Sequence, residues 1–397
     1  MKKGNEIKTV VPTLRFPEFQ KTEGWKEYKL KSLCEIGNGK DYKHLGSGNI
    51  PVYGSGGYMT SVDDFLYDGE SVCIGRKGTI DKPIFLTGKF WTVDTLFYTH
   101  SFHNCLPKFL YLIFQQINWY KYNEAGGVPS LSKTTIGEIN VFVPVGEKGE
   151  LKEQQKIVDC IFSLDELIEA TTQKVEALKE HKKGLMQRLF PAEGKNVPDL
   201  RFPEFQEKKE WEEKQLGNIG EIITGNTPST KDITNYGGNK LFVSPADISN
   251  NRYVSDTKIK LTDKGFSVGR YIPANSVLFV CIGSTIGKVA QNKFECITNQ
   301  QINTIVPYEE YLSDFIYSVL EHKASQIAML AGQQAVPIIN KTLFSSISIL
   351  VPPQKEEQQK IADCFFSLDE LIEATSRKVE ILKEHKKGLM QQLFPKI

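Results

Sequence analysis

The chain has 397 residues, 40% hydrophobic and 24% charged, which is enough for two or more compact domains of a globular protein. Its net charge of +1 argues against a protein that binds nucleic acid through a large overall positive charge. DNA binding is compatible with this charge if basic groups cluster on the surface or if a partner supplies phosphate contacts. Seven scattered cysteines without a CxxC pair predict neither a disulfide framework nor a zinc site. The lack of a long apolar run or a secretory leader predicts a cytoplasmic protein.

In chain order, the first repeated segment is LRFPEFQ at residues 14–20, shortly before Trp25. The same seven residues occur again at 200–206, shortly before Trp211. Short β-rich runs punctuated by Gly, Pro and Asn follow each copy and predict strands joined by loops. These runs are SVCI (71–74), NVFVP (140–144), SVLFVCI (276–282) and SISILVP (346–352). One amphipathic helix is predicted in each half, over 107–122 and 309–331. The fold class is therefore α+β, with one mixed domain in each half.

Each half closes with the same long segment, because residues 153–191 return at 357–395 with six of 39 positions changed. The segments of about 125 residues between the repeats are related only loosely, yet their apolar skeletons align. VPSLSKTTIGEINVFVP (128–144) matches VPIINKTLFSSISILVP (336–352), with Lys133 and Lys341 in register. A shared skeleton with altered polar side chains indicates one fold with two specificities.

Apolar residues in both repeated segments recur at alternating steps of four and three, which predicts a coiled-coil seam with Thr and Lys in its gaps. The apolar seam positions are Ile157, Ile161, Leu164, Ile168, Val175, Leu178, Leu185, Leu189, Ile361, Phe365, Leu368, Ile372, Val379, Leu382, Leu389 and Leu393. The gaps are Thr171, Lys182, Thr375 and Lys386.

Two nearly identical stripes in one chain favour internal antiparallel pairing about a pseudo-twofold axis. A helix docked on its own domain and a homodimeric coiled coil are the alternatives. About 37 helical residues would span roughly 55 Å, on the scale of the ~34 Å turn of DNA, which predicts a spacer between two DNA readers. Ser163 to Glu166 form a candidate capping box that could break the first helix, so this length is an upper bound and helix continuity stays open.

Motifs for catalysis are not recognisable in the sequence. GSTIGK (283–288) has three residues between its glycines where a phosphate-binding loop needs four, so a strand and a tight turn are predicted instead. The glycine-rich GSGNIPVYGSGGY (46–58) does not match a dinucleotide fingerprint, and HExxH, GxSxG and zinc-spaced Cys/His groups are missing. We therefore predict no catalytic residues, no metal site and no cofactor on this chain.

Polar loops that differ between the halves are the candidates for DNA contacts, because Arg, Lys, Asn and Gln pair with base edges while Ser, Thr and Tyr often bind phosphates. Ordinary surface loops are the alternative for any single residue. The candidates in the first half are Lys40, Tyr42, Lys43, His44, Ser47, Asn49, Tyr53, Ser55, Arg76, Lys77 and Lys133. Those in the second half are Asn226, Thr227, Ser229, Thr230, Lys231, Ser284, Thr285, Lys288, Gln333, Gln334 and Lys341.

Variable β-rich domains alternating with repeated VP…EQQKI helices closely resemble the specificity subunits of type I restriction-modification enzymes. VPVGEKGELKEQQKI (143–157) and VPPQKEEQQKI (351–361) resemble the family's junction between recognition domain and helix, and GNTPST (225–230) resembles its GxTPS loop. The first junction departs from the family pattern, with GEKGEL in place of a proline-rich turn. The resemblance extends from Leu14 to Pro395.

The resemblance implies a segment at 1–20, target recognition domains at 21–145 and 211–353, helices at 146–191 and 354–397, and a linker at 192–210. Each domain would read one half of a split site on double-stranded DNA, and the helices would bind two modification subunits. Those subunits would carry S-adenosylmethionine, and restriction subunits would use ATP and Mg²⁺. A coiled-coil adaptor with two protein-binding domains, and a self-sufficient nuclease or methyltransferase, are the rival functions.

Overall fold

The computed structural model describes residues 9–146, 151–249, 251–332 and 337–396. The chain divides into two compact units, one formed by Met1–Ala170 with Val379–Ile397 and the other by Thr171–Lys378. The predicted α+β class with two similar domains and two long helices is confirmed. Each long helix is shared between the two units, so the compact units do not end where the sequence segments end. In the described part of the chain, no helix is long and apolar enough to cross a bilayer.

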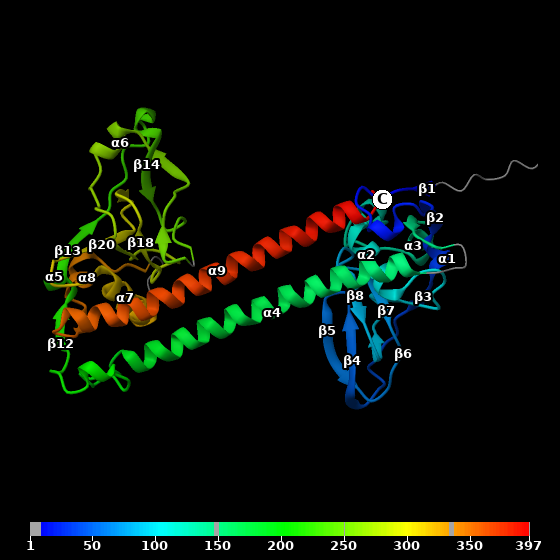
Figure 1. The fold of residues 1–397 in the computed structure, drawn as a ribbon, viewed down its shortest axis with the longest axis horizontal. Helices are drawn as coiled ribbons and strands as arrows, with labels where there is room; N and C mark the ends of the chain where they lie inside the picture. Colours follow the sequence, from blue (N-terminus) through cyan, green and yellow to red (C-terminus); the bar gives the residue numbers. More distant parts are fainter. Residues whose placement is uncertain (1–8, 147–150, 250, 333–336, 397) are drawn as a thin grey trace, which may run out of the picture. The chain divides into compact units, whose positions relative to one another are not determined.

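The described residues of the first unit form three small sheets, shown in blue and cyan in Figure 1. One has the order β1 (Thr9–Val10), β2 (Trp25–Lys29), β11 (Asn140–Val143), and the next β3 (Glu35–Asn38), β10 (Leu96–His100), β7 (Ser71–Gly75), β8 (Ile84–Leu86). The third is β5 (Gly57–Val62), β4 (Ser47–Gly54), β9 (Lys89–Thr92), β6 (Tyr67–Asp68). Its helices are α1 (Leu30–Leu33), α2 (Pro107–Gln116) and α3 (Lys133–Gly137).

The second unit repeats this plan with matching strand orders. Its two-stranded sheet pairs β12 (Glu212–Gln215) with β21 (Ser348–Val351). The next sheet has the order β13 (Gly220–Thr224), β20 (Ile302–Pro307), β17 (Val277–Val280), β18 (Val289–Asn292), β15 (Tyr253–Val254). The third has the order β16 (Ile259–Leu261), β14 (Tyr236–Val243), β19 (Cys296–Thr298). Its helices are α5 (Leu216–Ile219), α6 (Asp263–Ser267), α7 (Ser313–Met329) and α8 (Lys341–Ser346). In both units a hairpin-like sheet contains one parallel pair, β4 with β9 and β14 with β19.

The predicted helix over 107–122 is shorter than expected, because α2 ends at Gln116 and a 3-10 turn at Trp119–Tyr122 follows. Trp119 is buried and its indole NH donates to the Phe114 carbonyl, which folds the chain back at this point. The second predicted helix, over 309–331, is α7. All four predicted strand runs fall on strands, namely β7, β11, β17 and β21.

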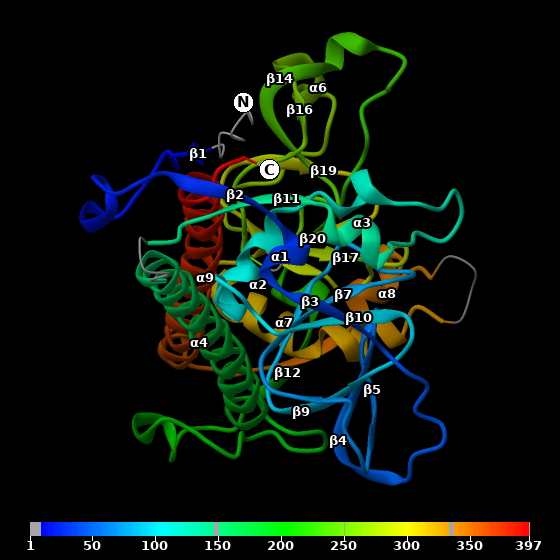
Figure 2. The ribbon, with the colours of Figure 1, turned by 90° about the vertical axis from the view of Figure 1, so that its right-hand side faces the viewer.

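The repeated segments form α4 (Lys152–Leu189) and α9 (Lys355–Leu393). In the first unit the start of α4 packs against the end of α9, and Ile157 and Ile161 share one core with Leu393. In the second unit the end of α4 packs against the start of α9, and Leu189 lies in one core with Phe365. The pairing is therefore antiparallel, as predicted, and Figure 2 shows α2 beside this helix pair in the first unit.

The candidate break at Ser163 does not occur, because α4 continues unbroken from Lys152 to Leu189. The equivalent serine in α9, Ser367, donates its hydroxyl to the Asp363 carbonyl one turn back and caps no helix end. Burial of the seam on both sides of this point stabilises the continuous helix. All sixteen apolar seam positions are buried or half-buried, as are Thr171, Lys182, Thr375 and Lys386 in the gaps.

Candidate nucleic-acid interface

The EQQKI motif fixes each α+β domain to its long helix. Glu153 accepts two hydrogen bonds of 2.7 Å from the Arg15 guanidinium, and the indole NH of Trp25 donates to the same carboxylate at 3.1 Å. Both Arg15 and Glu153 are buried, so the pair is shielded from water. This contact explains why LRFPEFQ, the following tryptophan and EQQKI recur together in the sequence.

The second domain repeats the same contact. Glu357 accepts from the Arg201 guanidinium at 2.8 and 2.7 Å and from the Trp211 indole at 3.1 Å. The next residue in each motif also has a fixed role, because Gln154 accepts from the Leu106 amide and its counterpart Gln358 accepts from the Leu312 amide. Each domain is therefore held by its helix through one shared set of bonds, and its outer loops are free to differ.

The turn that follows β7 in the first domain occupies the same backbone position as the turn that follows β17 in the second domain. The Arg76 amide donates to the Thr95 carbonyl at 2.8 Å, and the Cys281 amide donates to the Gln301 carbonyl at 2.7 Å. Leu131 and Ile339 donate in turn to the carbonyls of Arg76 and Cys281, each at 2.9 Å. These matched bonds make Arg76 equivalent to Cys281.

The glycine that follows each of these turns has a positive φ, +92° at Gly78 and +94° at Gly283, where glycine is strongly favoured. The bridges Lys77–Ser130 and Ile282–Ile338 then join each turn to the loop before the last strand. The turn and this loop therefore present side chains from equivalent backbone positions in the two domains.

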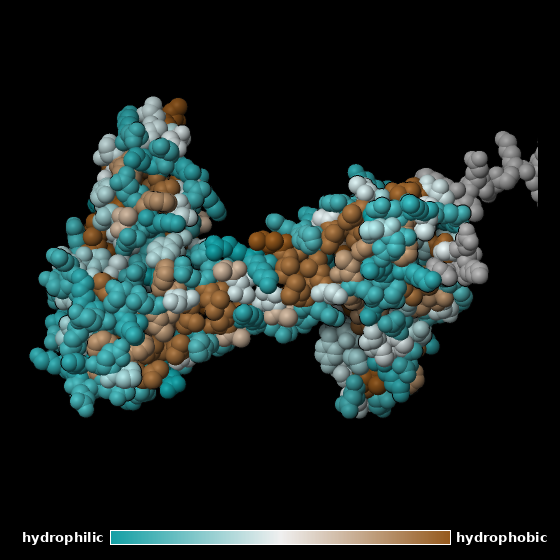
Figure 3. Space-filling view, in the orientation of Figure 1, coloured by the Kyte–Doolittle hydropathy of each residue, from teal (hydrophilic) through white to brown (hydrophobic). Residues whose placement is uncertain are grey.

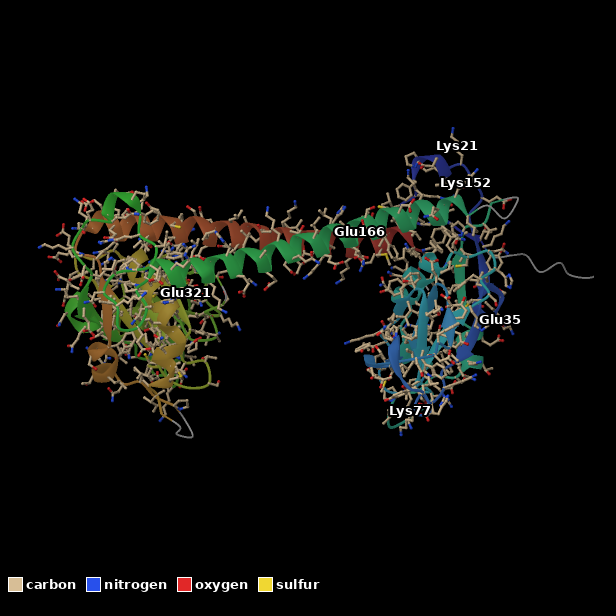
Figure 4. All side chains as sticks on the ribbon, turned by 90° about the horizontal axis from the view of Figure 1, so that it is seen from below. Lys21, Glu35, Lys77, Lys152, Glu166 and Glu321 are labelled. Atoms are coloured by element: carbon tan, nitrogen blue, oxygen red, sulfur yellow. The ribbon has the colours of Figure 1, made fainter. Side chains whose placement is uncertain are left out.

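In the first domain this turn borders a surface depression of about 710 Å³, whose lining includes Asn38, Arg76, Lys77, Phe97, Glu124 and Lys133. Arg76 and Lys77 are exposed, and Figure 4 shows Lys77 at the end of this domain that is remote from α4. A methyl group on Gly78 would lie 3.2 Å from the Ser55 hydroxyl, so the β4–β5 hairpin reaches the same surface. The structure thus brings together the candidates Ser55, Arg76, Lys77 and Lys133.

The other candidates of the first domain lie on β4 and in the segment that precedes it. The indole NH of Trp91 donates to the Lys40 carbonyl, and the His44 ring lies 5.9 Å from the Trp91 ring. Tyr42 packs partly against the small core below them, whereas Lys43 is exposed. On β4 itself, Ser47 and Asn49 are exposed and Tyr53 is half-buried.

In the second domain the GNTPST loop and the turn at 283–287 meet through a polar segment at 299–301. Thr227 donates its hydroxyl to Gln300 at 2.7 Å, and the Gln301 side chain donates to the Ile282 carbonyl at 3.3 Å. Ser284 is exposed and Thr285 half-buried on this turn. The candidates Ser229, Thr230 and Lys231 are exposed on the neighbouring loop, while Gln333 and Gln334 lie outside the described residues, as do positions 147–150 of the GEKGEL junction.

Two further candidates of the second domain form hydrogen bonds within it. The Lys288 ammonium donates to the Ile248 carbonyl at 2.7 Å, and the Asn226 carbonyl oxygen accepts from the Arg270 amide at 2.7 Å. GSTIGK itself forms the predicted tight turn after a strand. Sequence reasoning missed Asn38, Phe97, Glu124 and the pair Gln300 and Gln301, although the polar run TNQQ between two buried strands was a visible signal for the last two.

All seven cysteines carry free thiols. Burial raises the pKa of Cys73 to about 12 and that of Cys296 to about 12, so these thiols stay protonated at neutral pH. They act as small apolar groups in the cores.

Two copies of one α+β domain on a pair of antiparallel helices define a class of proteins built to present two related recognition surfaces. The chain belongs to the family described as the type I restriction modification DNA specificity domain, whose model matches residues 22–180 and 208–384. It is 24% identical over 395 residues to the type I restriction enzyme HindI specificity subunit of Haemophilus influenzae, covering 81% of this chain and 82% of that protein.

A second relative is the EcoR124I/EcoR124II specificity subunit of Escherichia coli, 30% identical over 197 residues, 47% of this chain and 48% of that protein. The crystal structure of a type I restriction-modification S subunit from M. genitalium matches 98% of this chain and 100% of that one with a TM-score of 0.69 and 15% identity. A chain from a structural study of type I restriction-modification assembly matches with a TM-score of 0.56 at 13% identity, over 94% and 98% of the two chains. These two structures share the fold.

Proposed function

We propose that this chain is the DNA sequence-specificity subunit of a type I restriction-modification complex, in which each recognition domain reads one half of a split site. The observation that carries the proposal is the pair of equivalent turns. Their backbone hydrogen bonds match, but their side chains differ, with Arg76 and Lys77 in one domain and Cys281 and Ile282 in the other. A shared frame with different polar groups suits two readers of different sequences.

We further propose that the two long helices dock two modification subunits, with restriction subunits joining the complex. Large apolar side chains remain exposed on these helices, among them Leu371 and Ile381, which are 43% and 64% exposed. Figure 3 shows hydrophobic surface along the helices. Exposed apolar side chains on a helix offer contact area to a partner protein.

In this proposal the chain is not itself an enzyme and binds no cofactor. S-adenosylmethionine would be held by the modification subunits, and ATP and Mg²⁺ by the restriction subunits. The complex would act in the cytoplasm, where its DNA is found. Phosphate contacts from the modification subunits would supplement this chain, whose own net charge is only +1.

The direct test is methylation of a randomised DNA library by this chain purified with its modification subunits and S-adenosylmethionine, read by sequencing the methylated molecules. The proposal predicts one split motif with two defined halves and an unread spacer. Methylation by this chain alone would contradict the non-catalytic assignment. Methylation without any sequence preference would favour the adaptor function instead.

A further inference from the structure

The most informative difference between the two domains lies at the pair of sheet positions beside the matched turns. In the first domain the Arg76 guanidinium lies over the Phe97 ring, 6.0 Å from its centroid. Strand pairing places Ile74 opposite Phe97 and Phe279 opposite Asn303, so Phe97 and Asn303 are equivalent. The first domain therefore carries Arg76 and Phe97 at the two positions where the second domain carries Cys281 and Asn303.

These two pairs have different consequences for the surface. Asn303 is buried, accepts from the Thr224 hydroxyl at 2.6 Å and lies beside the buried Cys281, so this pair faces inward. Arg76 is exposed, and in the described part of the chain its side chain has no hydrogen bond or ion pair, only the ring beneath it. An arginine whose guanidinium group stacks on an aromatic ring loses less side-chain conformational entropy when it binds a ligand, because the ring already orients the planar group of N–H donors.

The rim of the same depression carries a fixed acceptor. Glu124 accepts hydrogen bonds from the hydroxyls of Ser132 and Thr135, and these bonds lower the pKa of its carboxyl group, so Glu124 is ionised at neutral pH. A carboxylate disfavours a phosphate at that point, but it accepts readily from the amino group of a base. Arginine donors beside a carboxylate acceptor match the major-groove edge of a G·C pair, with guanine O6 and N7 as acceptors and cytosine N4 as donor.

One lysine, in contrast, is common to both domains. Lys133 follows the capping residue Ser132, and Lys341 follows the capping residue Asn340, so both begin a short helix at the same backbone position. Neither lysine has a hydrogen bond or an ion pair within the residues that the structure describes. A basic group that two readers of different sequences share fits a contact to phosphate, which carries no sequence information.

We propose that Arg76, with Glu124, reads a G·C pair in the first half-site, and that Lys133 and Lys341 bind DNA phosphates in equivalent ways in the two halves. The second domain has no arginine at this turn and reads its half-site with neutral groups there. This assignment rests on the proposed function and adds the base pair and the residues that read it.

The test uses the full chain assembled with its modification subunits and a DNA library randomised in the first half-site. Wild type should prefer G·C over the other pairs at one position by about 5- to 150-fold, the range that corresponds to a good bidentate contact. Arg76→Gln should abolish this preference and leave the second half-site unchanged. Arg76→Lys should weaken it while the salt dependence of binding stays the same, because the charge and a donor to guanine remain but the planar fork does not.

The lysine variants are matched controls. Lys133→Gln and Lys341→Gln should each weaken binding to all sequences alike and reduce the slope of log affinity against log salt by about one. The inference is overturned if wild type shows no G·C preference in the first half, if the preference survives in both Arg76 variants, or if Lys133→Gln changes the base preference. Wild type without sequence preference in either half would overturn the proposed function as well.

Discussion

The ammonium group of Lys182 in α4 lies 2.6 Å from a carboxylate oxygen of Asp369 in α9, at a seam position that an apolar residue would normally fill. The same lysine donates to Glu321 of α7 at 2.5 Å. Its repeat counterpart, Lys386, donates to Asp165 at 2.6 Å, and this pair is more exposed. The repeated lysines thus fix the pairing of the helices in both units, and among the described residues a recognition-domain helix joins the contact in the second unit only.

Lys182→Met should lower the free energy of unfolding by about 3 kcal/mol, because Glu321 and Asp369 both lose the lysine ammonium and Asp369 keeps only Arg252, at 3.8 Å. Lys386→Met is the matched control and should cost about 1 kcal/mol or less, because Asp165 is 40% exposed and water replaces the lost contact. Urea denaturation of both variants measures the difference. Equal losses in the two variants would show that the Glu321 contact contributes nothing.

Glu321→Gln should alter the pH dependence of stability. Burial raises the pKa of Glu321 above its ordinary value of 4.5, although the Lys182 ammonium partly opposes this. The native state therefore binds this proton more tightly than the unfolded chain, and stability falls as pH rises from 4.5 through the raised native pKa. The variant, which is neutral at every pH, should lose less stability than wild type over that interval in parallel unfolding titrations. Parallel pH profiles for the two proteins would contradict this.

Glu153→Gln should release the segment 14–25 from the first unit, because Arg15 and Trp25 lose a buried charged acceptor. We expect the opening free energy of this segment to fall by about 3 kcal/mol, measured as faster amide hydrogen exchange at 14–25 and not at 200–211. Glu357→Gln should give the reverse pattern around Arg201 and Trp211. Faster exchange in both segments in either variant would refute independent attachment of the domains.

Insertion of one heptad into both long helices should lengthen the unread spacer of the target without changing either half-site. Seven residues add about 10.5 Å to a helix and keep the seam in phase, and this rise equals about three base pairs of DNA. Sequencing the methylated motif of the variant complex measures the spacer. An unchanged spacer would mean that the helices do not set the distance between the half-sites.

The repeat, the α+β class and the helix seam could be predicted from sequence because each depends on local periodicity or on comparison of one half with the other. Whether the first helix breaks at Ser163 could not be decided from sequence, because a local capping signal competes with the packing of the seam on both sides, which keeps α4 continuous. The burial of Lys182 beside Glu321 was not predictable, since these residues are 139 positions apart. The Arg76 and Phe97 contact likewise depends on which strands become neighbours.

The central claim is that one chain carries two separate readers, and exchange of residues 21–145 for the same region of a related subunit tests it most directly. Methylome sequencing of cells that contain the chimera and the modification subunits should reveal a motif changed in one half only, with the other half and the spacer retained. A motif changed in both halves, or in neither, would contradict the account.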